Sequence, residues 1–220
     1  MRLVVFDVDG TIVDSAHIII DAAHYAFEKE KLSIPTPHAV RSGIGLKLET
    51  AIGHLLEEHD DVLVDRLAGH YRDYFFGKVT DEPHIEHIYD GAYDAIHRLG
   101  AHEKTLLGIA TGKHLRGIHR LFDNHDFGHH FVTLQAADNN PSKPHPGMLH
   151  NAINETGVEV ARTVMVGDTS YDMQMAKAAN VKAIGVAWGY HDKADLLEHG
   201  ADVVIDKYEH IDEAIDGLIG

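Results

Sequence analysis

The sequence predicts an α/β fold, a doubly wound parallel sheet that is interrupted once by a helical insert. Three observations lead to this prediction. Residues 2–8 (RLVVFDV) form a short apolar, β-branched run that ends in acidic side chains, as expected for a buried strand. From about residue 83 onward, similar runs alternate with helical patterns, which is typical of parallel strands joined by right-handed helical crossovers. Residues 15–82 break this alternation, because they contain helical patterns and no convincing strand.

Further apolar runs predict the other strands of the sheet. Each run has the length of a single strand, and several are followed at once by a small or polar residue. The second strand leads into Thr111-Gly112, and a later one leads into Gly167-Asp168. The predicted strands cover residues 104–110, 131–134, 162–166, 182–186 and, more weakly, 202–205.

Amphipathic helical patterns separate these strands. In residues 91–99 the apolar side chains recur at the spacing of one helix face. Several of the patterns open with Ser, Asp or Pro, which are common at helix starts. Helices that cover both faces of a parallel sheet form a Rossmann-like core. The other helical patterns cover residues 146–156, 170–179, 192–199 and 208–218.

The insert contains three longer amphipathic patterns, which we expect to form a small helical bundle, or cap, over the sheet. Two linkers, near residues 12–15 and 80–88, would join this cap to the core. The expected division is a catalytic core domain of residues 1–14 plus 83–220 and a helical cap domain of residues 15–82. The three patterns are SAHIIIDAAHYAFEKEKL, LKLETAIGHLLEEH and VLVDRLAGHYRDYFF.

The composition excludes several classes of function. The 220 residues include 35 acidic and 19 basic side chains, which gives a formal net charge of −16. This acidity argues against binding to nucleic acid or to anionic membranes, since both need basic patches. No apolar run approaches the ~20 residues of a membrane helix, and the start of the chain does not resemble a signal peptide. We therefore expect a cytoplasmic protein, either a monomer or a homodimer, whose partner is a small molecule.

The Cys and His content restricts metal and redox chemistry. The chain has no Cys, which excludes disulfides, thiolate nucleophiles and Cys-based zinc sites. Its 20 His residues are spread along the chain. Pairs such as His84/His87 and His129/His130 lack a partner cluster at the spacing of a zinc site, so we interpret them as solvated surface residues.

The first candidate site residues are two carboxylates, Asp7 and Asp9, in the segment DVDGT at the end of the first strand. In extended backbone, side chains two residues apart share one face. Like charges this close repel one another unless a cation lies between them. Mg²⁺ is such a cation, because it prefers hard oxygen ligands and bridges proteins to phosphates. One carboxylate could then attack phosphorus while the other moves a proton.

A second acidic pair, Asp168 and Asp172, follows the strand at residues 162–166. The carboxyl ends of parallel strands meet at one edge of a sheet, where ligands bind. Asp168 is therefore placed to complete a metal site with the first carboxylates. Asp172 would lie one helical turn further on, on the same helix face.

Two further segments offer groups that could hold a phosphate. Thr111 and Gly112 supply a hydroxyl group and unhindered backbone N–H groups at a helix start, which is an anion-binding arrangement. Lys143 lies in a proline-rich loop, where its charge could neutralise a phosphoryl group.

In this order, the segments DVDGT, ATGK, SKPHPG and VGDTSYDM resemble the four motifs of the haloacid dehalogenase-like hydrolase superfamily. The helical insert after the first motif is similar to the α-helical cap class of that superfamily. The segment VAWGYHDKADLLEHGADVVID resembles the corresponding part of phosphoglycolate-phosphatase-like members. The resemblance spans essentially the whole chain.

This resemblance implies a Mg²⁺-dependent phosphatase that acts on a small, phosphoglycolate-like metabolite through an aspartyl-phosphate. Asp7 would be the nucleophile, and Asp9 would protonate the leaving oxygen and later activate water. Asp7, the backbone carbonyl of Asp9, and Asp168 would hold the metal ion. Asp9 also argues against dehalogenation, because a halide leaving group needs neither an acid nor Mg²⁺.

The remaining motif residues would bind the phosphate. Thr111 and the N–H group of Gly112 would contact phosphate oxygens. Lys143 would neutralise the phosphate and the nucleophile, and Asp172 would orient Lys143 or a metal-bound water. Many members of the superfamily have Asn where Gly112 stands, so one side-chain donor is missing here.

The cap would select the substrate. The loop from Arg41 to Lys47, between cap helices, is the segment that we expect to reach the rim of the sheet. Arg41 and Lys47 could then meet an anionic group of the substrate. Solvent-facing charges are the alternative for both residues.

Other functions stay open at this stage. The same residues would serve a pyrophosphatase or a phosphosugar mutase. A phospho-accepting receiver module would be much shorter and would lack the insert. A phosphate-ligand sensor on this fold would need no turnover, although the intact motif residues argue against it.

Overall fold

The computed structural model describes residues 1–77 and 86–220, and its core is a six-stranded parallel sheet. The strands are β1 (Arg2–Phe6), β4 (Thr105–Ala110), β5 (Phe131–Gln135), β6 (Thr163–Gly167), β7 (Lys182–Val186) and β8 (Val203–Ile205). They lie in the order β5-β4-β1-β6-β7-β8, and every neighbouring pair is parallel. This arrangement confirms the predicted doubly wound α/β core, and all six predicted strands form.

Helices cover both faces of the sheet. They are α5 (Ala92–Gly100), α6 (Leu115–Asn124), α7 (Gly147–Thr156), α8 (Ser170–Ala178), α9 (Lys193–Glu198) and α10 (Ile211–Ile219), with short 3₁₀ turns at Gly128–His130, Val160–Arg162 and Tyr208–His210. Val4 and Phe6 of β1 pack with α5, α6 and α10, whereas Leu3 and Val5 pack with α7, α8 and α9. Because successive side chains point to opposite faces and both faces are buried, β1 is apolar from Leu3 to Phe6.

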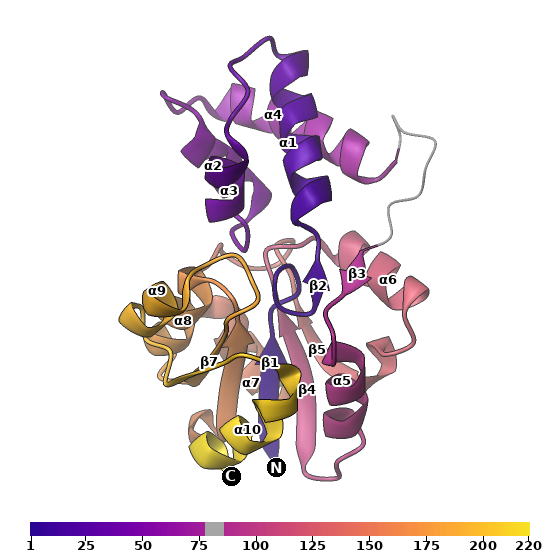
Figure 1. The fold of residues 1–220 in the computed structure, drawn as a ribbon, viewed down its shortest axis with the longest axis vertical. Helices are drawn as coiled ribbons and strands as arrows, with labels where there is room; N and C mark the ends of the chain where they lie inside the picture. Colours follow the sequence, from indigo (N-terminus) through magenta and orange to yellow (C-terminus); the bar gives the residue numbers. More distant parts are fainter. Residues whose placement is uncertain (78–85) are drawn as a thin grey trace.

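In the described part of the chain between β1 and α5, four helices form the cap, residues 16–75, which lies beyond the carboxyl ends of the strands and away from both termini (Figure 1). They are α1 (Ala16–Lys29), α2 (Pro37–Ser42), α3 (Leu48–Leu55) and α4 (Asp61–Phe75). α1 and α4 pack together through an apolar cluster that includes Phe27 and Leu67. The side chains of Thr36 and Asp60 accept hydrogen bonds from first-turn N–H groups, which explains where α2 and α4 begin.

Two helices, α2 and α6, are additional to those that we predict from the sequence. α2 has six residues, which are too few to show a repeated apolar pattern. In α6 the apolar side chains of Leu115, Ile118, Leu121 and Phe122 lie on one helix face and pack on the core, so the sequence carried a periodic signal that the prediction above did not use. Among the described residues, no helix has both the length and the apolar character needed to cross a membrane.

The chain enters and leaves the cap through segments that lie side by side. β2 (Val13–Asp14) pairs with β3 (His87–Ile88) as a short antiparallel ribbon, and both strands fall within the predicted linkers. The part of the second linker before residue 86 lies outside the described residues, as does the predicted cap boundary at residue 82. The ribbon therefore joins the cap to the core at one place.

One His pair has a neighbour that the sequence spacing did not reveal. Nε2 of His130 lies 2.9 Å from Nδ1 of His97 in α5, and the ring of His129 lies beside both. These three residues come from two elements far apart in the sequence, so only the packing of the turn at 128–130 against α5 brings them together. His84, from the other pair, lies outside the described residues.

Candidate active site

Three candidate residues follow the carboxyl ends of adjacent strands. Asp7 comes directly after β1, Thr111 after β4 and Asp168 after β6. Since β1 lies between β4 and β6, these residues share one edge of the sheet. All three are buried, and the cap lies over this edge (Figure 1). This edge is where open parallel α/β sheets bind their ligands.

Three carboxylates are buried together at this edge. Oxygens of Asp7, Asp168 and Asp172 lie within 4.8 Å of one another, and all three residues are fully buried. Burial raises the pKa of Asp7 to about 7, with Lys143 opposing the rise and Asp172 adding to it. Burial and the charges of Asp7 and Asp172 raise the pKa of Asp168 well above its usual value. The cluster therefore holds more negative charge than its protein surroundings neutralise.

Lys143 is the cation of this cluster. Its Nζ lies 2.6 Å from Oδ1 of Asp172 and 3.0 Å from Oδ2 of Asp7, and its side chain is fully buried. Burial alone would lower the pKa of Lys143, but the charges of Asp172 and Asp7 raise it to about 12. Lys143 therefore stays charged and joins the third motif to the first and the fourth.

The start of α8 holds Asp172 in place. Its Oδ2 accepts hydrogen bonds from the backbone N–H group (3.1 Å) and the hydroxyl group (2.7 Å) of Thr169. The hydroxyl oxygen of Thr169 in turn accepts from the N–H group of Asp172, which completes a capping box. Oδ1 of Asp172 accepts from Lys143. Asp172 therefore couples the helix start to the position of the Lys143 ammonium.

Two loops orient Asp168. Its Oδ1 accepts a hydrogen bond from the hydroxyl group of Thr11 (2.8 Å), and its Oδ2 accepts one from the N–H group of Tyr190 (2.9 Å). Glycines make room for this carboxylate: a Cβ added at Gly10 or at Gly189 would lie 2.1 Å from an atom of Asp168. Gly10 also has a φ of +84°, a conformation that favours glycine.

The donor set at this edge suits a divalent cation. Oδ2 of Asp7 is buried and accepts no hydrogen bond, although the Lys143 ammonium is 3.0 Å away. The Lys143 ammonium pairs with Asp7 and Asp172, and the third carboxylate of the cluster, Asp168, adds a further negative charge that remains to be neutralised. Carboxylate oxygens are the ligands that Mg²⁺ prefers. The residues present therefore fit a bound Mg²⁺ ion.

The side chain of Asp9 belongs to a different network from that of Asp7. Its Oδ1 accepts hydrogen bonds from the hydroxyl group of Ser15 (2.6 Å) and from Nζ of Lys113 (2.7 Å). Lys113 also contacts Glu86, and both residues are buried. Burial alone would lower the pKa of Lys113, but the charges of Asp9 and Glu86 raise it. The side chains of the two carboxylates of the first motif thus contact two different ammonium groups.

Gly112 lies directly under the cap. A Cβ added at Gly112 would lie 2.3 Å from the carbonyl oxygen of Leu46 and 2.8 Å from that of Gly45. Gly45 is also close to the acidic cluster, since a Cβ added there would lie 3.8 Å from Oδ2 of Asp7. The loop between α2 and α3 therefore covers the strand ends, and it leaves no room for a side chain at position 112.

The two cations expected to meet the substrate lie at the two ends of this loop, Arg41 in the last turn of α2 and Lys47 directly before α3. Arg41 is exposed, and neither Arg41 nor Lys47 lines the cavity between cap and core. Lys47 contacts the core through its backbone N–H group, which donates to the hydroxyl group of Ser142 (3.0 Å). The loop thus reaches the rim through Gly45 and Leu46, and the role of the two cations in specificity stays a prediction.

The sequence patterns did not single out four residues that the structure places at the site. They are Ser15, Glu86, Lys113 and Tyr190. Lys113 follows Gly112 after a predicted strand, and Tyr190 follows β7 in a loop with glycine, so their positions offered a usable signal. Glu86 offered none, because only the packing of the linker brings it to Lys113.

Comparison with known proteins identifies the family to which this chain is similar. The family model described as haloacid dehalogenase-like hydrolase matches residues 4–186. The chain is 32% identical over 221 residues to the protein named Probable phosphatase IndB from Dickeya dadantii, a match that covers 99% of this chain and 94% of that protein. It is 28% identical over 214 residues to a phosphoglycolate phosphatase from Pseudomonas fluorescens, covering 93% of this chain and 76% of that protein.

A solved structure shares the fold. The crystal structure of a predicted phosphatase from Clostridium acetobutylicum matches with a TM-score of 0.87 at 23% sequence identity, and the match covers 99% of both chains. The family match extends over most of the chain and includes the residues of all four motifs. The chain therefore belongs to the haloacid dehalogenase-like hydrolase family, in which it is similar to the phosphoglycolate-phosphatase-like members.

Proposed function

We propose that this phosphatase hydrolyses a small phosphorylated metabolite, similar in size to phosphoglycolate, with Mg²⁺ as cofactor and an aspartyl-phosphate on Asp7 as intermediate. One observation carries the proposal: oxygens of three buried carboxylates lie within 4.8 Å of one another at the carboxyl edge of the sheet, and the ammonium group of Lys143 pairs with two of them. Burying such charges is unfavourable unless cations compensate them. A phosphate group that arrives with a metal ion would complete this charge balance beside Asp7.

In the proposed first step, an oxygen of Asp7 attacks phosphorus, and the bond from phosphorus to the ester oxygen breaks. The N–H group of Val8 orients Asp7 by donating to its Oδ1 (2.7 Å). Asp9 gives a proton to the departing oxygen. The hydrogen bonds from Ser15 and Lys113 both reach Oδ1 of Asp9, so we assign the proton to Oδ2.

In the proposed second step, water hydrolyses the aspartyl-phosphate. Asp9, now ionised, takes a proton from the attacking water, and inorganic phosphate leaves Asp7 as a free carboxylate. The loop that contains Gly45 and Leu46 covers the strand ends, which supports a role of the cap in excluding bulk solvent.

The other motif residues would bind the metal ion and the phosphate. Asp7, the backbone carbonyl of Asp9, and Asp168 would hold Mg²⁺, whose charge offsets that of the phosphoryl group. Thr111 and the N–H group of Gly112 would contact phosphate oxygens. Lys143 would neutralise negative charge between the phosphate and Asp7, in the position that Asp172 gives it.

The domain division is part of the same proposal. Residues 15–82 would act as a cap domain on a core of residues 1–14 plus 83–220, with the ribbon of β2 and β3 between them. A cytoplasmic location and a monomeric or homodimeric state stay predictions from the sequence.

Phosphate trapping tests this function. The protein is incubated with [³²P]acetyl phosphate, with Mg²⁺ or with EDTA, and quenched in acid. We expect turnover and a hydroxylamine-labile label only with Mg²⁺, and neither the label nor more than ~1% of the steady turnover in Asp7→Asn. Asp14→Asn, a change at a nearby exposed carboxylate, is the control.

Three outcomes would contradict the proposal. Full turnover in EDTA would remove the metal ion from the mechanism, and labelling of Asp7→Asn would move the nucleophile to another residue. Binding of phosphate without turnover would indicate a sensor. Pyrophosphate and phosphosugars as further substrates separate the two enzyme alternatives, since a mutase returns the label to a sugar and a pyrophosphatase prefers pyrophosphate.

A further inference from the structure

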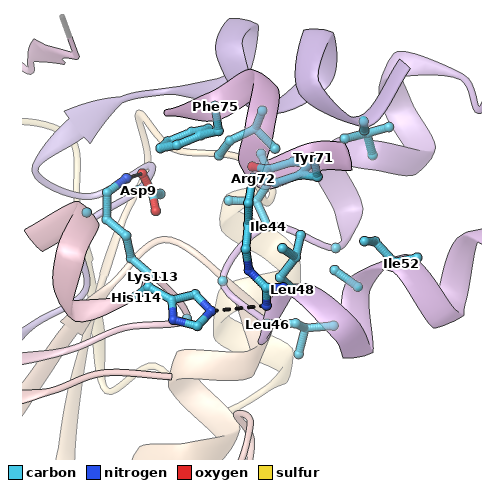
Figure 2. A pocket seen from close by; sticks show the side chains of 18 of the residues that line it. Asp9, Ile44, Leu46, Leu48, Ile52, Tyr71, Arg72, Phe75, Lys113 and His114 are labelled. Atoms are coloured by element: carbon cyan, nitrogen blue, oxygen red, sulfur yellow. Dashed lines mark hydrogen bonds and ion pairs between the residues drawn. The ribbon is translucent and has the colours of Figure 1, made fainter. Parts of the chain in front are cut away.

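A cavity of about 100 Å³ lies between the cap and the core, beside Asp9 (Figure 2). Its walls come from α1, α3 and α4, from the loop between α2 and α3, and from residues 112–117 of the core. Asp9, Gly112 and Lys113 line it on the core side, so it is continuous with the proposed active site. A phosphate ester bound at Asp7 would therefore extend its organic group toward this cavity.

The cap side of the cavity is apolar. Figure 2 shows Phe75 and Tyr71 along one wall and the aliphatic side chains of the loop and of α3 along another. Burial, with the negative charges of Asp9 and Glu86, raises the pKa of Tyr71 well above its usual value, so its phenol group stays uncharged. The larger aliphatic side chains of these walls include Ile19, Val40, Ile44, Leu48 and Ile52.

The charged residues that line the cavity already have partners. Arg72 forms an ion pair with Glu49. His114 lies between the Arg72 guanidinium (3.3 Å) and the carboxylate of Asp138 (3.0 Å). Lys113 is shared by Asp9 and Glu86. Among the described residues that line this cavity, each Lys and Arg therefore has an acidic partner, and a carboxylate on the substrate would compete with that partner.

The size of the cavity also restricts the organic group. An engineered apolar cavity of ~150 Å³ stays dry and admits benzene. A cavity of about 100 Å³ with similar walls suits a short branched alkyl chain or one small ring. A sugar would bring several hydroxyl groups against walls that are mostly aliphatic, and each hydroxyl buried without a hydrogen bond is unfavourable.

We propose that the substrate of this phosphatase carries a small apolar organic group, and no charge other than its phosphate. The proposal rests on the function proposed above, because it assumes that phosphate binds at Asp7. The apolar group packs against Leu48, Tyr71 and Phe75, and the ester oxygen faces Asp9. Phosphoglycolate, by contrast, would direct its carboxylate at an apolar wall and at a guanidinium that Glu49 already neutralises.

A matched pair of substrates tests the proposal on the wild-type protein. Isobutyl phosphate and 2-phosphoglycolate have nearly the same shape, and an isopropyl group replaces the carboxylate. We expect kcat/KM with Mg²⁺ to be at least ~10-fold higher for isobutyl phosphate, although its alkoxide is the poorer leaving group. In the series from methyl to butyl phosphate, kcat/KM should rise about three- to fourfold for each methylene group. Equal or better use of phosphoglycolate would overturn the proposal.

The variant Glu49→Gln tests whether Glu49 neutralises the guanidinium group of Arg72 that lines the cavity. It frees the charge of Arg72 and changes no residue that lines the cavity. We expect the ratio of kcat/KM for phosphoglycolate to that for isobutyl phosphate to rise by roughly tenfold, with isobutyl phosphate nearly unaffected. Glu30→Gln is the matched control, because Glu30 pairs with Arg66 of the same helix α4, outside this cavity. An unchanged ratio in Glu49→Gln would overturn the placement of the organic group beside Arg72.

Acetyl phosphate separates failure of this inference from failure of the proposed function. If neither acetyl phosphate nor any phosphate ester is hydrolysed with Mg²⁺, the phosphatase mechanism itself is wrong. If acetyl phosphate labels the protein but phosphoglycolate is preferred to isobutyl phosphate, only the substrate inference is wrong. The substrate comparison needs no variant, so it decides the question even if a substituted protein does not fold.

Discussion

The backbone of Gly112 lies against the carbonyl oxygen of Leu46, so closely that a Cβ at position 112 would come within 2.3 Å of that oxygen. Gly112 belongs to the core loop that we propose to bind phosphate, and Leu46 belongs to the cap. The contact is therefore the point at which the cap meets a group proposed to bind phosphate. A side chain at position 112 would clash with backbone atoms of the cap loop. Unlike a side chain, the backbone cannot move aside by changing its rotamer.

The first prediction follows from this contact. Gly112→Ala should displace the cap loop and lower kcat/KM by at least ~10-fold, because misplacement by about 1 Å can cost ~10²-fold in rate. The protein should stay folded, since the displaced segment is a loop. Gly217→Ala is the control, because a Cβ there meets nothing within 4 Å. Steady-state kinetics and a thermal melt check the prediction, and unchanged kinetics in Gly112→Ala would show that the loop yields freely.

The second prediction concerns the ammonium group that Asp9 and Glu86 share. Lys113→Met should leave two buried carboxylates without this cation and lower the free energy of unfolding by about 3–5 kcal/mol. Lys182→Met removes a half-exposed ion pair with Asp202 and should cost only about 0–1 kcal/mol. Urea unfolding of both variants measures the difference. Equal losses would mean that the Lys113 network contributes no more than a surface pair.

The third prediction separates the two proton transfers assigned to Asp9. With an alkyl phosphate, Asp9→Asn should slow formation of the phospho-enzyme by roughly 10²–10⁴-fold, because an alkoxide needs a proton to leave. With p-nitrophenyl phosphate the loss should be much smaller, because nitrophenolate leaves as a stable anion. The second step needs Asp9 as a base for either substrate.

Rapid-quench kinetics measures this difference. Asp9→Asn should release about one equivalent of p-nitrophenol per active site in a burst, followed by slow turnover and a trapped phospho-enzyme. Asn retains the oxygen that accepts from Ser15 and Lys113, so the local structure should persist. Equal loss with both substrates and no burst would assign Asp9 to metal placement or folding.

The fourth prediction is a pH dependence of metal stabilisation. Burial raises the pKa of Asp7 to about 7 in the folded protein, whereas an unfolded Asp titrates near ~3.9. The folded state thus binds more protons than the unfolded state between these values, so the stability of the metal-free protein should fall as pH rises from about 4 to 7. Asp168, whose pKa is also raised, acts in the same direction. Lys143, with a pKa of about 12, stays charged throughout this range and adds no slope.

Thermal melts with Mg²⁺ and with EDTA test this prediction. Mg²⁺ should raise Tm more at pH 8, where the carboxylates are ionised, than at pH 5, where protons compete for them. In Asp7→Asn both the Mg²⁺ effect and its pH dependence should shrink. The same Mg²⁺ effect at both pH values would contradict the charge balance proposed for the cluster.

The core, and the edge of the sheet at which the site lies, can be predicted from the sequence. Apolar runs such as residues 2–8 and 162–166 predict strands that are buried on both faces, and parallel strands bring their carboxyl ends to one edge. Asp7 and Asp168 could therefore be placed together before any coordinates were known. This prediction works because each residue's position follows from its own strand and from one general rule of sheet topology.

The contacts between the side chains of the site follow from the tertiary structure and could not be predicted from the sequence. Lys143 is 136 positions from Asp7, yet it pairs with both Asp7 and Asp172, and Asp9 instead pairs with Lys113. Nothing in the local periodicity encodes such contacts, because they depend on how a loop crosses the end of a neighbouring strand. The side chains of Asp7 and Asp9 therefore belong to two separate ion-pair networks, a difference that their spacing in the sequence does not reveal.

The cap shows most clearly the difference between what the sequence predicts and what depends on the tertiary structure. Its helical character follows from amphipathic patterns, and the loop from residue 41 to 47 does reach the rim. Charge alone singled out Arg41 and Lys47 on that loop, but the structure turns the backbone of Gly45 and Leu46 toward the site and leaves Arg41 exposed. The pairing of Arg72 with Glu49 likewise appears only when α3 packs against α4. Periodicity determines which residues form a helix, whereas the packing of helices and loops determines which side chain faces a neighbour, and that depends on the whole chain.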